Sequence, residues 1–143
     1  MPDRIYVGGT FDLFHCGHIA LLRRASELGP VTVALNTDEF SAQYKRPPIL
    51  TFAERVELVA ACRYVENVIV NTGGKDSRPS ILASGCNVIV HGDDWTGEPL
   101  MAQLSVTQEW LDDHGVRIHY LPYTVGISSA AIERRILAAR SNA

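Results

Sequence analysis

The stretch from residue 8 to residue 18 constrains the fold more than any other part of this sequence. It reads Gly-Gly-Thr-Phe-Asp-Leu-Phe-His-Cys-Gly-His. A short apolar run, 5–7, precedes it, and residues 19–28 follow with apolar side chains at helical spacing. We therefore predict a strand, a glycine-containing turn and a helix, with the turn at the strand end where open α/β sheets bind ligands.

The composition of this turn favours an anionic ligand. Glycines let backbone amides approach an anion closely, and the start of a helix attracts negative charge. His15 and His18 stand at the predicted helix start, separated by Cys16 and Gly17. Imidazoles donate hydrogen bonds to phosphate oxygens and can be cationic near neutral pH. The pattern predicts a phosphate site with two histidines directed at it.

Composition limits the other classes of function. The 143 residues are 46% hydrophobic and 20% charged, which predicts one globular domain over residues 1–143. A net charge of −3 argues against general nucleic-acid binding, which requires a basic face. Cys16, Cys62 and Cys86 occur singly, which fits neither a disulfide framework nor a zinc site and favours the cytoplasm. No signal peptide and no membrane-spanning run are expected.

The remainder of the chain alternates between short apolar runs and helical patterns. Thr37 or Asp38 is predicted to cap a short helix, and Thr51 with Glu54 fits a capping box. The other predicted elements are, in chain order, strand 31–35, helix 52–62, strand 65–70, helix 80–84, strand 87–90, helix 98–114, strand 116–121 and helix 130–139. Five strands alternating with helices predict a doubly wound α/β domain with a parallel sheet.

Further candidate residues follow other predicted strands. Lys45 and Arg46 lie in a proline-containing loop, where a solvated loop is the better interpretation from the residues alone. Asp94 follows strand 87–90, where a simple turn is the alternative to a site for ribose, base or metal. Ser128 precedes the last helix, where it can cap the helix or bind phosphate with the free amides.

Taken together, the motifs resemble those of the cytidylyltransferases in the nucleotidyltransferase superfamily. The resemblance covers about residues 4–137 and is closest to members that act on glycerol 3-phosphate. It implies a Rossmann-like five-stranded parallel sheet of order 3-2-1-4-5 and a homodimer. The matching motifs are Gly9-Thr10-Phe11-Asp12, His15-Cys16-Gly17-His18, Arg63-Tyr64-Val65-Glu66, His91-Gly92-Asp93-Asp94-Trp95 and Gly126-Ile127-Ser128-Ser129.

The resemblance also implies roles for individual residues. The catalytic residues, which would stabilise charge on phosphates, are His15, His18 and the loop cations Lys45 and Arg46. The nucleotide-binding residues are Gly9, Thr10, Phe11, Asp12, Asp94, Thr124, Gly126, Ile127, Ser128 and Ser129. The residues implied for the acceptor are Arg55, Arg63 and Trp95, with the two arginines alternatively at the dimer edge. Mg²⁺ is expected with the nucleotide, and its protein ligands cannot be read from the sequence.

The implied reaction joins CTP to a small phosphorylated alcohol, such as glycerol 3-phosphate, and releases pyrophosphate. No nucleic-acid or membrane partner is expected. Two alternatives stay open. ATP-dependent adenylyltransferases of the same superfamily share the paired histidines and a similar Ile-Ser-Ser turn, although Asp93-Asp94-Trp95 favours CTP. A nucleotide-binding domain without catalysis is the other, because Tyr123 stands where the family has an arginine.

Overall fold

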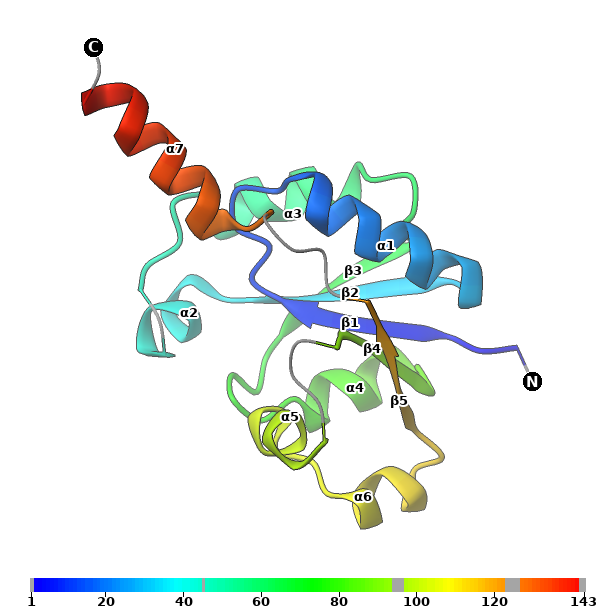
Figure 1. The fold of residues 1–143 in the computed structure, drawn as a ribbon. Coiled ribbons are helices and arrows are strands. Elements are labelled where there is room, and N and C mark those ends of the chain that lie inside the picture. Colours follow the sequence, from blue (N-terminus) through cyan, green and yellow to red (C-terminus); the bar gives the residue numbers. More distant parts are fainter. Residues whose placement is uncertain (1, 45, 94–96, 123–126, 142–143) are drawn as a thin grey trace.

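A central parallel sheet organises the computed structural model, which describes residues 2–44, 46–93, 97–122 and 127–141 (Figure 1). Across these residues the sheet has five strands in the order β3-β2-β1-β4-β5, and every pairing is parallel. This confirms the predicted doubly wound sheet of order 3-2-1-4-5. The strands are β1 (Ile5–Gly9), β2 (Val31–Asn36), β3 (Asn67–Asn71), β4 (Val88–Gly92) and β5 (Arg117–Leu121).

Helices cover both faces of the sheet. Figure 1 shows α1 and α3 on one face, α4, α5 and α6 on the other, and α7 extending away from the sheet. No helix in the described part of the chain is long and apolar enough to cross a bilayer. The helices are α1 (Cys16–Leu28), α2 (Asp38–Tyr44), α3 (Phe52–Ala60), α4 (Arg78–Ser84), α5 (Gly97–Leu104), α6 (Gln108–Asp113) and α7 (Ser129–Ser141).

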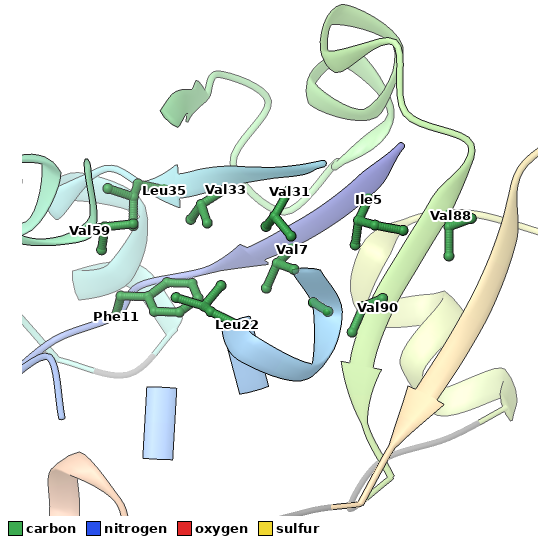
Figure 2. Packing of buried hydrophobic residues seen from close by; sticks show 11 residues of the cluster. Ile5, Val7, Phe11, Leu22, Val31, Val33, Leu35, Val59, Val88 and Val90 are labelled. Atoms are coloured by element: carbon green, nitrogen blue, oxygen red, sulfur yellow. The ribbon is translucent and has the colours of Figure 1, made fainter. Parts of the chain in front are cut away.

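The core lies in two layers, one on each face of the sheet. Strands buried on both faces are expected to be continuously apolar, and every residue of β2 is buried. On the first face, Val7 and Val33 pack with Leu22 of α1 and Val59 of α3 (Figure 2). Burying one such side chain contributes about 1.5–3 kcal/mol. On the second face, Tyr6 and Ala34 of the strands pack with Ile81 of α4 and Leu111 of α6.

Hydrogen bonds at three helix starts agree with the sequence predictions. Thr51 and Glu54 form the predicted capping box of α3. The hydroxyl of Thr37 accepts a hydrogen bond from the amide of Phe40 at 3.1 Å, at the start of α2. The hydroxyl of Ser128 accepts one from the amide of Ala131 at 3.0 Å and caps α7.

The single helix predicted over 98–114 is wrong, because this segment forms α5 and α6 with a break between them. Ser105 ends α5 in a left-handed conformation with φ of 61°, and its hydroxyl donates to the carbonyl oxygen of Lys75 at 2.8 Å. Thr107 then caps α6. Leu104 and Leu111 both pack on the same face of the sheet. Their spacing equals two helical turns. The apolar pattern in the sequence therefore continues across the break between α5 and α6 and does not reveal it.

The sheet opens at its centre, where the chain order reverses. β1 is in register with β2 from Ile5 to Gly9, whereas its register with β4 runs over Ile5 and Tyr6. The chain runs outward from β1 through β2 to β3 and then returns to β4 on the other side of β1. Such a point of reversal leaves a crevice at the carboxyl ends of the strands, which is where open α/β sheets bind ligands.

Candidate functional site

A pocket of about 680 Å³ occupies this crevice. Gly8 of β1 and His91 of β4 line the pocket, together with His15 and His18 at the start of α1. Ser128, at the start of α7, lies on the same pocket. The structure therefore brings together the first turn and the last turn of the chain, which the sequence predicted to be phosphate sites independently.

His15 and His18 are held by backbone hydrogen bonds that close the start of α1. Nδ1 of His15 accepts from the amide of Gly17 at 3.0 Å, and Nδ1 of His18 accepts from the amide of His15 at 3.1 Å. The two side chains thus form a capping box made of histidines. A ring nitrogen that accepts a hydrogen bond carries no proton, so each neutral ring has its proton on Nε2. Nε2–H is then the donor that each ring retains.

Burial disfavours the cationic form of both histidines, against the expectation that either can be cationic near neutral pH. Burial, and to a smaller extent the neighbouring His15, lowers the pKa of His18 to about 3. Burial also lowers the pKa of His15. The sequence could not reveal this, because the desolvation comes from Phe11 and Phe14, whose rings pack against His18.

Gly17 is required by the close approach of the two histidines. Their rings stack with centroids 3.7 Å apart. A Cβ atom on Gly17 would lie 2.9 Å from Cε1 of His15 and 3.1 Å from Cγ2 of Ile127. Any side chain at this position would therefore push the imidazole of His15 out of its cap or displace the segment before α7.

The turn after β1 is strained, and Asp12 holds it in place. Phe11 and Leu13 both have positive φ, 54° and 50°, a conformation that costs non-glycine residues about 1–3 kcal/mol each. The carboxylate of Asp12 accepts hydrogen bonds from the amides of Leu13, Ile49 and Leu50 at 2.8–3.0 Å. It therefore fixes the loop before α3 onto this turn. Strain of this kind is typical of functional turns.

A smaller pocket of about 190 Å³ adjoins the first and is lined by Thr10 and Ser41. The two pockets share His18, Arg46 and Ser129. Arg46 forms an ion pair with Glu133 of α7, and this carboxylate raises the pKa of the Arg46 guanidinium. The loop cation expected from the sequence thus lies at the site, but a carboxylate that the sequence did not predict is its partner.

Arg55 does not bind an acceptor directly, and this part of the sequence prediction is wrong. Its side chain is fully buried. Its guanidinium donates to the carbonyl oxygens of Thr10 at 2.8 Å and Asn36 at 2.9 Å, and to Oδ1 of Asp38 at 2.6 Å. Arg55 and Val59 are the buried residues of α3 at a spacing of one turn, and that spacing was the available signal that Arg55 faces inward.

Arg63 lies away from the pocket. It is exposed and borders a separate groove with Gly29, Pro30 and Glu66, at the edge where β2 begins. The amide of Glu66 donates to the carbonyl of Val31 at this edge. Within one chain Arg63 therefore does not border the pocket beside His15. Its two implied roles, at the acceptor or at the dimer edge, stay predictions.

Several predicted site residues lie outside the described part of the chain, namely Lys45, Asp94, Trp95, Thr124 and Gly126. Among the residues that are described, no three histidine, cysteine, aspartate or glutamate side chains are grouped to hold a metal ion. No protein ligand for Mg²⁺ is therefore assigned.

Some residues of the site were missed from the sequence. One of them is Gly8, which precedes the predicted Gly9 and lines the larger pocket. Nδ1 of His91 donates to the carbonyl oxygen of Gly92 at 2.9 Å, since a carbonyl can only accept, and His91 also lines this pocket. Glu133 follows Ser129 by one helical turn, so helical periodicity from Ser129 was the signal that could have identified it.

Fold and site together define an α/β domain of the nucleotidyltransferase type. The solved structure of the lipopolysaccharide core biosynthesis protein from Thermoplasma volcanium GSS1 has a similar fold. The TM-score is 0.69 at 21% identity, over 85% of this chain and 96% of that chain. At this level of identity the likeness shows a shared fold.

The chain belongs to the cytidylyltransferase-like family, whose model matches residues 6–135. The glycerol-3-phosphate cytidylyltransferase of Bacillus subtilis (strain 168) is 35% identical over 134 residues, which cover 93% of this chain and 96% of the relative. The FAD synthase of Thermococcus kodakarensis is 32% identical over 138 residues, which cover 94% of this chain and 91% of the relative. Cytidylyltransferases are nucleotidyltransferases, in agreement with the fold.

Proposed function

We propose that this chain transfers the cytidylyl group of CTP to the phosphate of a small phosphorylated alcohol, such as glycerol 3-phosphate, and releases pyrophosphate. The observation that carries the proposal is the pair of histidines that line the pocket, each with Nδ1 held by a backbone amide, which leaves Nε2–H as the donor of each ring. The 35% identity to a protein named glycerol-3-phosphate cytidylyltransferase supports the choice of nucleotide and acceptor.

The chemistry requires positioning and charge stabilisation more than proton transfer. An oxygen of the acceptor phosphate forms a bond with the α-phosphorus of CTP. The bond from the α-phosphorus to the oxygen that bridges to the β-phosphate breaks, and its electron pair leaves with pyrophosphate. The acceptor oxygen is already an anion, so no general base is needed. His15 and His18 donate hydrogen bonds to phosphate oxygens as charge develops on them.

Other residues complete the proposed site. Arg46 and Lys45 neutralise phosphate charge, and Ser128 with the free amides at the start of α7 binds the triphosphate. Gly9, Thr10, Phe11, Asp12, Ile127 and Ser129 are assigned to the nucleotide. The family resemblance alone assigns Asp94, Thr124 and Gly126 to the nucleotide and Trp95 to the acceptor. Mg²⁺ bound to the triphosphate would supply further neutralisation of its charge.

The test is pyrophosphate release with each of the four ribonucleoside triphosphates, Mg²⁺ and a panel of phosphorylated alcohols that includes glycerol 3-phosphate. We expect release with CTP and one acceptor. Release with ATP alone would instead identify an adenylyltransferase, the second candidate, which the FAD synthase relative favours because FAD contains an adenylyl group. Nucleotide binding without release for any pair would leave two readings: an acceptor outside the panel, or a binding domain without catalysis.

We further propose that the chain is a cytoplasmic homodimer with Arg63 at the dimer edge. The family resemblance and the groove beside Arg63 and Tyr64 support this assignment. Light scattering coupled to size-exclusion chromatography measures the mass directly, and a mass twice that of one 15.7 kDa chain is expected. Arg63→Glu should shift the equilibrium toward monomer, and an unchanged dimer would contradict this edge.

A further inference from the structure

Two arginines, Arg46 and Arg134, line the larger pocket, and in the described part of the chain they are its only permanent cations. The histidines contribute less positive charge, because burial disfavours the cationic form of His15 and His18. A triphosphate carries several negative charges. Its binding in this pocket therefore depends strongly on the two guanidinium groups.

The two arginines differ in what they contact. Arg46 is ion-paired with the carboxylate of Glu133. The guanidinium of Arg134 forms no ion pair and no hydrogen bond with any described residue. No acidic residue lies one turn away from it on α7, where the neighbours are Ala130, Ala131, Leu137 and Ala138. Arg134 is therefore the cation of the pocket that is available to a ligand without displacing a carboxylate.

The guanidinium of Arg134 is placed to reach the start of α7. Side chains on a helix tilt toward its N-terminus and lie over the preceding turn. For Arg134 that turn contains Ala130, which also lines the pocket and carries only a methyl group. This small side chain leaves room for the guanidinium to extend toward Ser128, where the triphosphate is proposed to bind.

Arg135, the next residue along α7, is a natural comparison for Arg134. It is turned by about 100° around the helix axis, and it is not among the residues that line the pocket. Both arginines are exposed, and neither has an acidic residue three or four positions away. The pair therefore has the same charge and the same helical surroundings but different access to the pocket.

We propose that Arg134 binds the β- and γ-phosphates of the nucleotide and holds the pyrophosphate group as it leaves. This inference rests on the proposed function for the identity of the ligand. A guanidinium group donates two parallel hydrogen bonds to one phosphate group. When the bond between the α-phosphorus and the bridging oxygen breaks, negative charge builds up on the pyrophosphate. Arg134 stabilises that charge by hydrogen bonds alone, with no transfer of a proton.

Calorimetry on three proteins tests the proposal. The dissociation constants of CTP, CMP and inorganic tripolyphosphate are measured at low salt for wild type, Arg134→Gln and Arg135→Gln. Loss of hydrogen bonds to a charged phosphate is expected to weaken CTP and tripolyphosphate binding roughly tenfold in Arg134→Gln and to leave CMP binding unchanged. Arg135→Gln should bind all three ligands as the wild type does, although it has lost the same charge.

Two results of this comparison would overturn the proposal. Equal losses in the two variants would show that each arginine acts only by long-range attraction. A loss for CMP as large as that for CTP would place Arg134 at the nucleoside or the α-phosphate. Both positions are exposed, and glutamine is a good helix former, so we expect both variants to fold with the melting temperature of the wild type.

Pyrophosphate gives a second readout that does not require turnover. Its dissociation constant should rise by a similar factor in Arg134→Gln and stay unchanged in Arg135→Gln. Unchanged pyrophosphate affinity in Arg134→Gln would contradict the claim that Arg134 holds the leaving group.

The outcomes separate this inference from the proposed function. Pyrophosphate release from CTP by the wild type, together with equal affinities in both variants, retains the function and rejects the inference. A loss specific to Arg134→Gln, together with release from ATP alone, retains the inference and rejects cytidylyl transfer. Absence of binding of any nucleotide or polyphosphate to the wild type overturns both.

Discussion

One hydrogen bond joins Ser129 to Asp12, from the hydroxyl of Ser129 to the carbonyl oxygen of Asp12 at 2.6 Å. It connects the first turn of the chain to the start of its last helix, and both segments line the pockets. Asp12 also anchors the loop before α3 through its carboxylate. The two residues therefore hold three separate segments of the site in one arrangement.

Ser129→Ala should loosen this arrangement. None of the described residues of α7 is buried, so its attachment depends strongly on contacts at its start. We expect faster amide hydrogen exchange along α7 and at least fivefold weaker binding of tripolyphosphate, since one such bond contributes about 1 kcal/mol. Ser128→Ala is the matched control, because it removes the cap but leaves the bond to Asp12. Equal exchange in both variants would show that capping alone holds the helix.

Two substitutions at His18 distinguish the role of Nδ1 in the cap from the role of Nε2–H as a donor. Asn at this position offers an acceptor near Nδ1 and preserves the cap, but it lacks the outer donor. Gln offers an N–H near Nε2 but loses the cap. We expect His18→Asn to remain stable and lose about 10²-fold or more in turnover, as for other charge-stabilising donors. His18→Gln should be less stable but retain more turnover. The reverse ranking would contradict the assigned roles of the nitrogens.

The low pKa of His18 makes stability depend on pH. Its pKa is about 3 in the folded chain against 6.5 for an ordinary histidine, so the unfolded state binds more protons between these values. The contribution of His18 to the free energy of unfolding is fully present above about pH 6.5. It is lost as the pH falls toward 3, at up to about 1.4 kcal/mol per pH unit.

The measurement is the free energy of unfolding in urea between about pH 5 and 6.5. His15 acts in the same direction, because its pKa is lowered as well. The ion-paired Asp3 and Asp76 have pKa values below their ordinary 3.8, so their contribution is lost below this window. His18→Asn should reduce the slope, and an unchanged slope would show that His18 is not the group responsible.

Arg55→Met should strongly destabilise the fold. The substitution leaves the carbonyl oxygens of Thr10 and Asn36 without their donor and removes the partner of Asp38. Breaking a buried ion pair costs about 3–5 kcal/mol, and the partial exposure of Asp38 places the expected loss near the lower end. Arg63→Met, on the exposed edge, should change the stability of the monomer by less than about 0.5 kcal/mol. Similar losses in both variants would contradict the different burial of the two arginines.

Glu133→Gln should raise the affinity for polyphosphate. Glu133 forms an ion pair with Arg46, so an incoming phosphate must compete with a carboxylate for this cation. We expect severalfold tighter binding of tripolyphosphate at low salt, with the gain reduced by salt screening. In an Arg46→Gln background the gain should disappear. A gain that persists there would reflect general repulsion by Glu133 and not release of Arg46.

Features encoded within one turn of chain were predictable from the sequence. The strand–turn–helix around His15 and His18, the cap at Ser128 and the alternation of strands and helices all depend on neighbouring residues. The same locality explains the error over 98–114. Leu104 and Leu111 keep helical spacing, and the left-handed Ser105 is stabilised by a carbonyl from Lys75, far away in the sequence.

Features that depend on strand register were not predictable. The hydrogen bond from Asn71 to Asn36 requires knowledge that β2 and β3 are aligned at these two residues. The neutrality of His18 depends on aromatic rings brought against it by the strained turn. The pairing of Arg46 with Glu133 joins residues 87 positions apart. Each is a long-range contact that local patterns do not contain.

The pocket side of α7 consists of Ala130, Glu133, Arg134 and Leu137, which share one face of the helix and line the crevice. A helix of this length is marginal in water without tertiary packing. A ligand in the crevice would pack against this face of α7. The bound ligand would then stabilise the helix. The concentration of that small molecule would then set how far the C-terminal helix is formed.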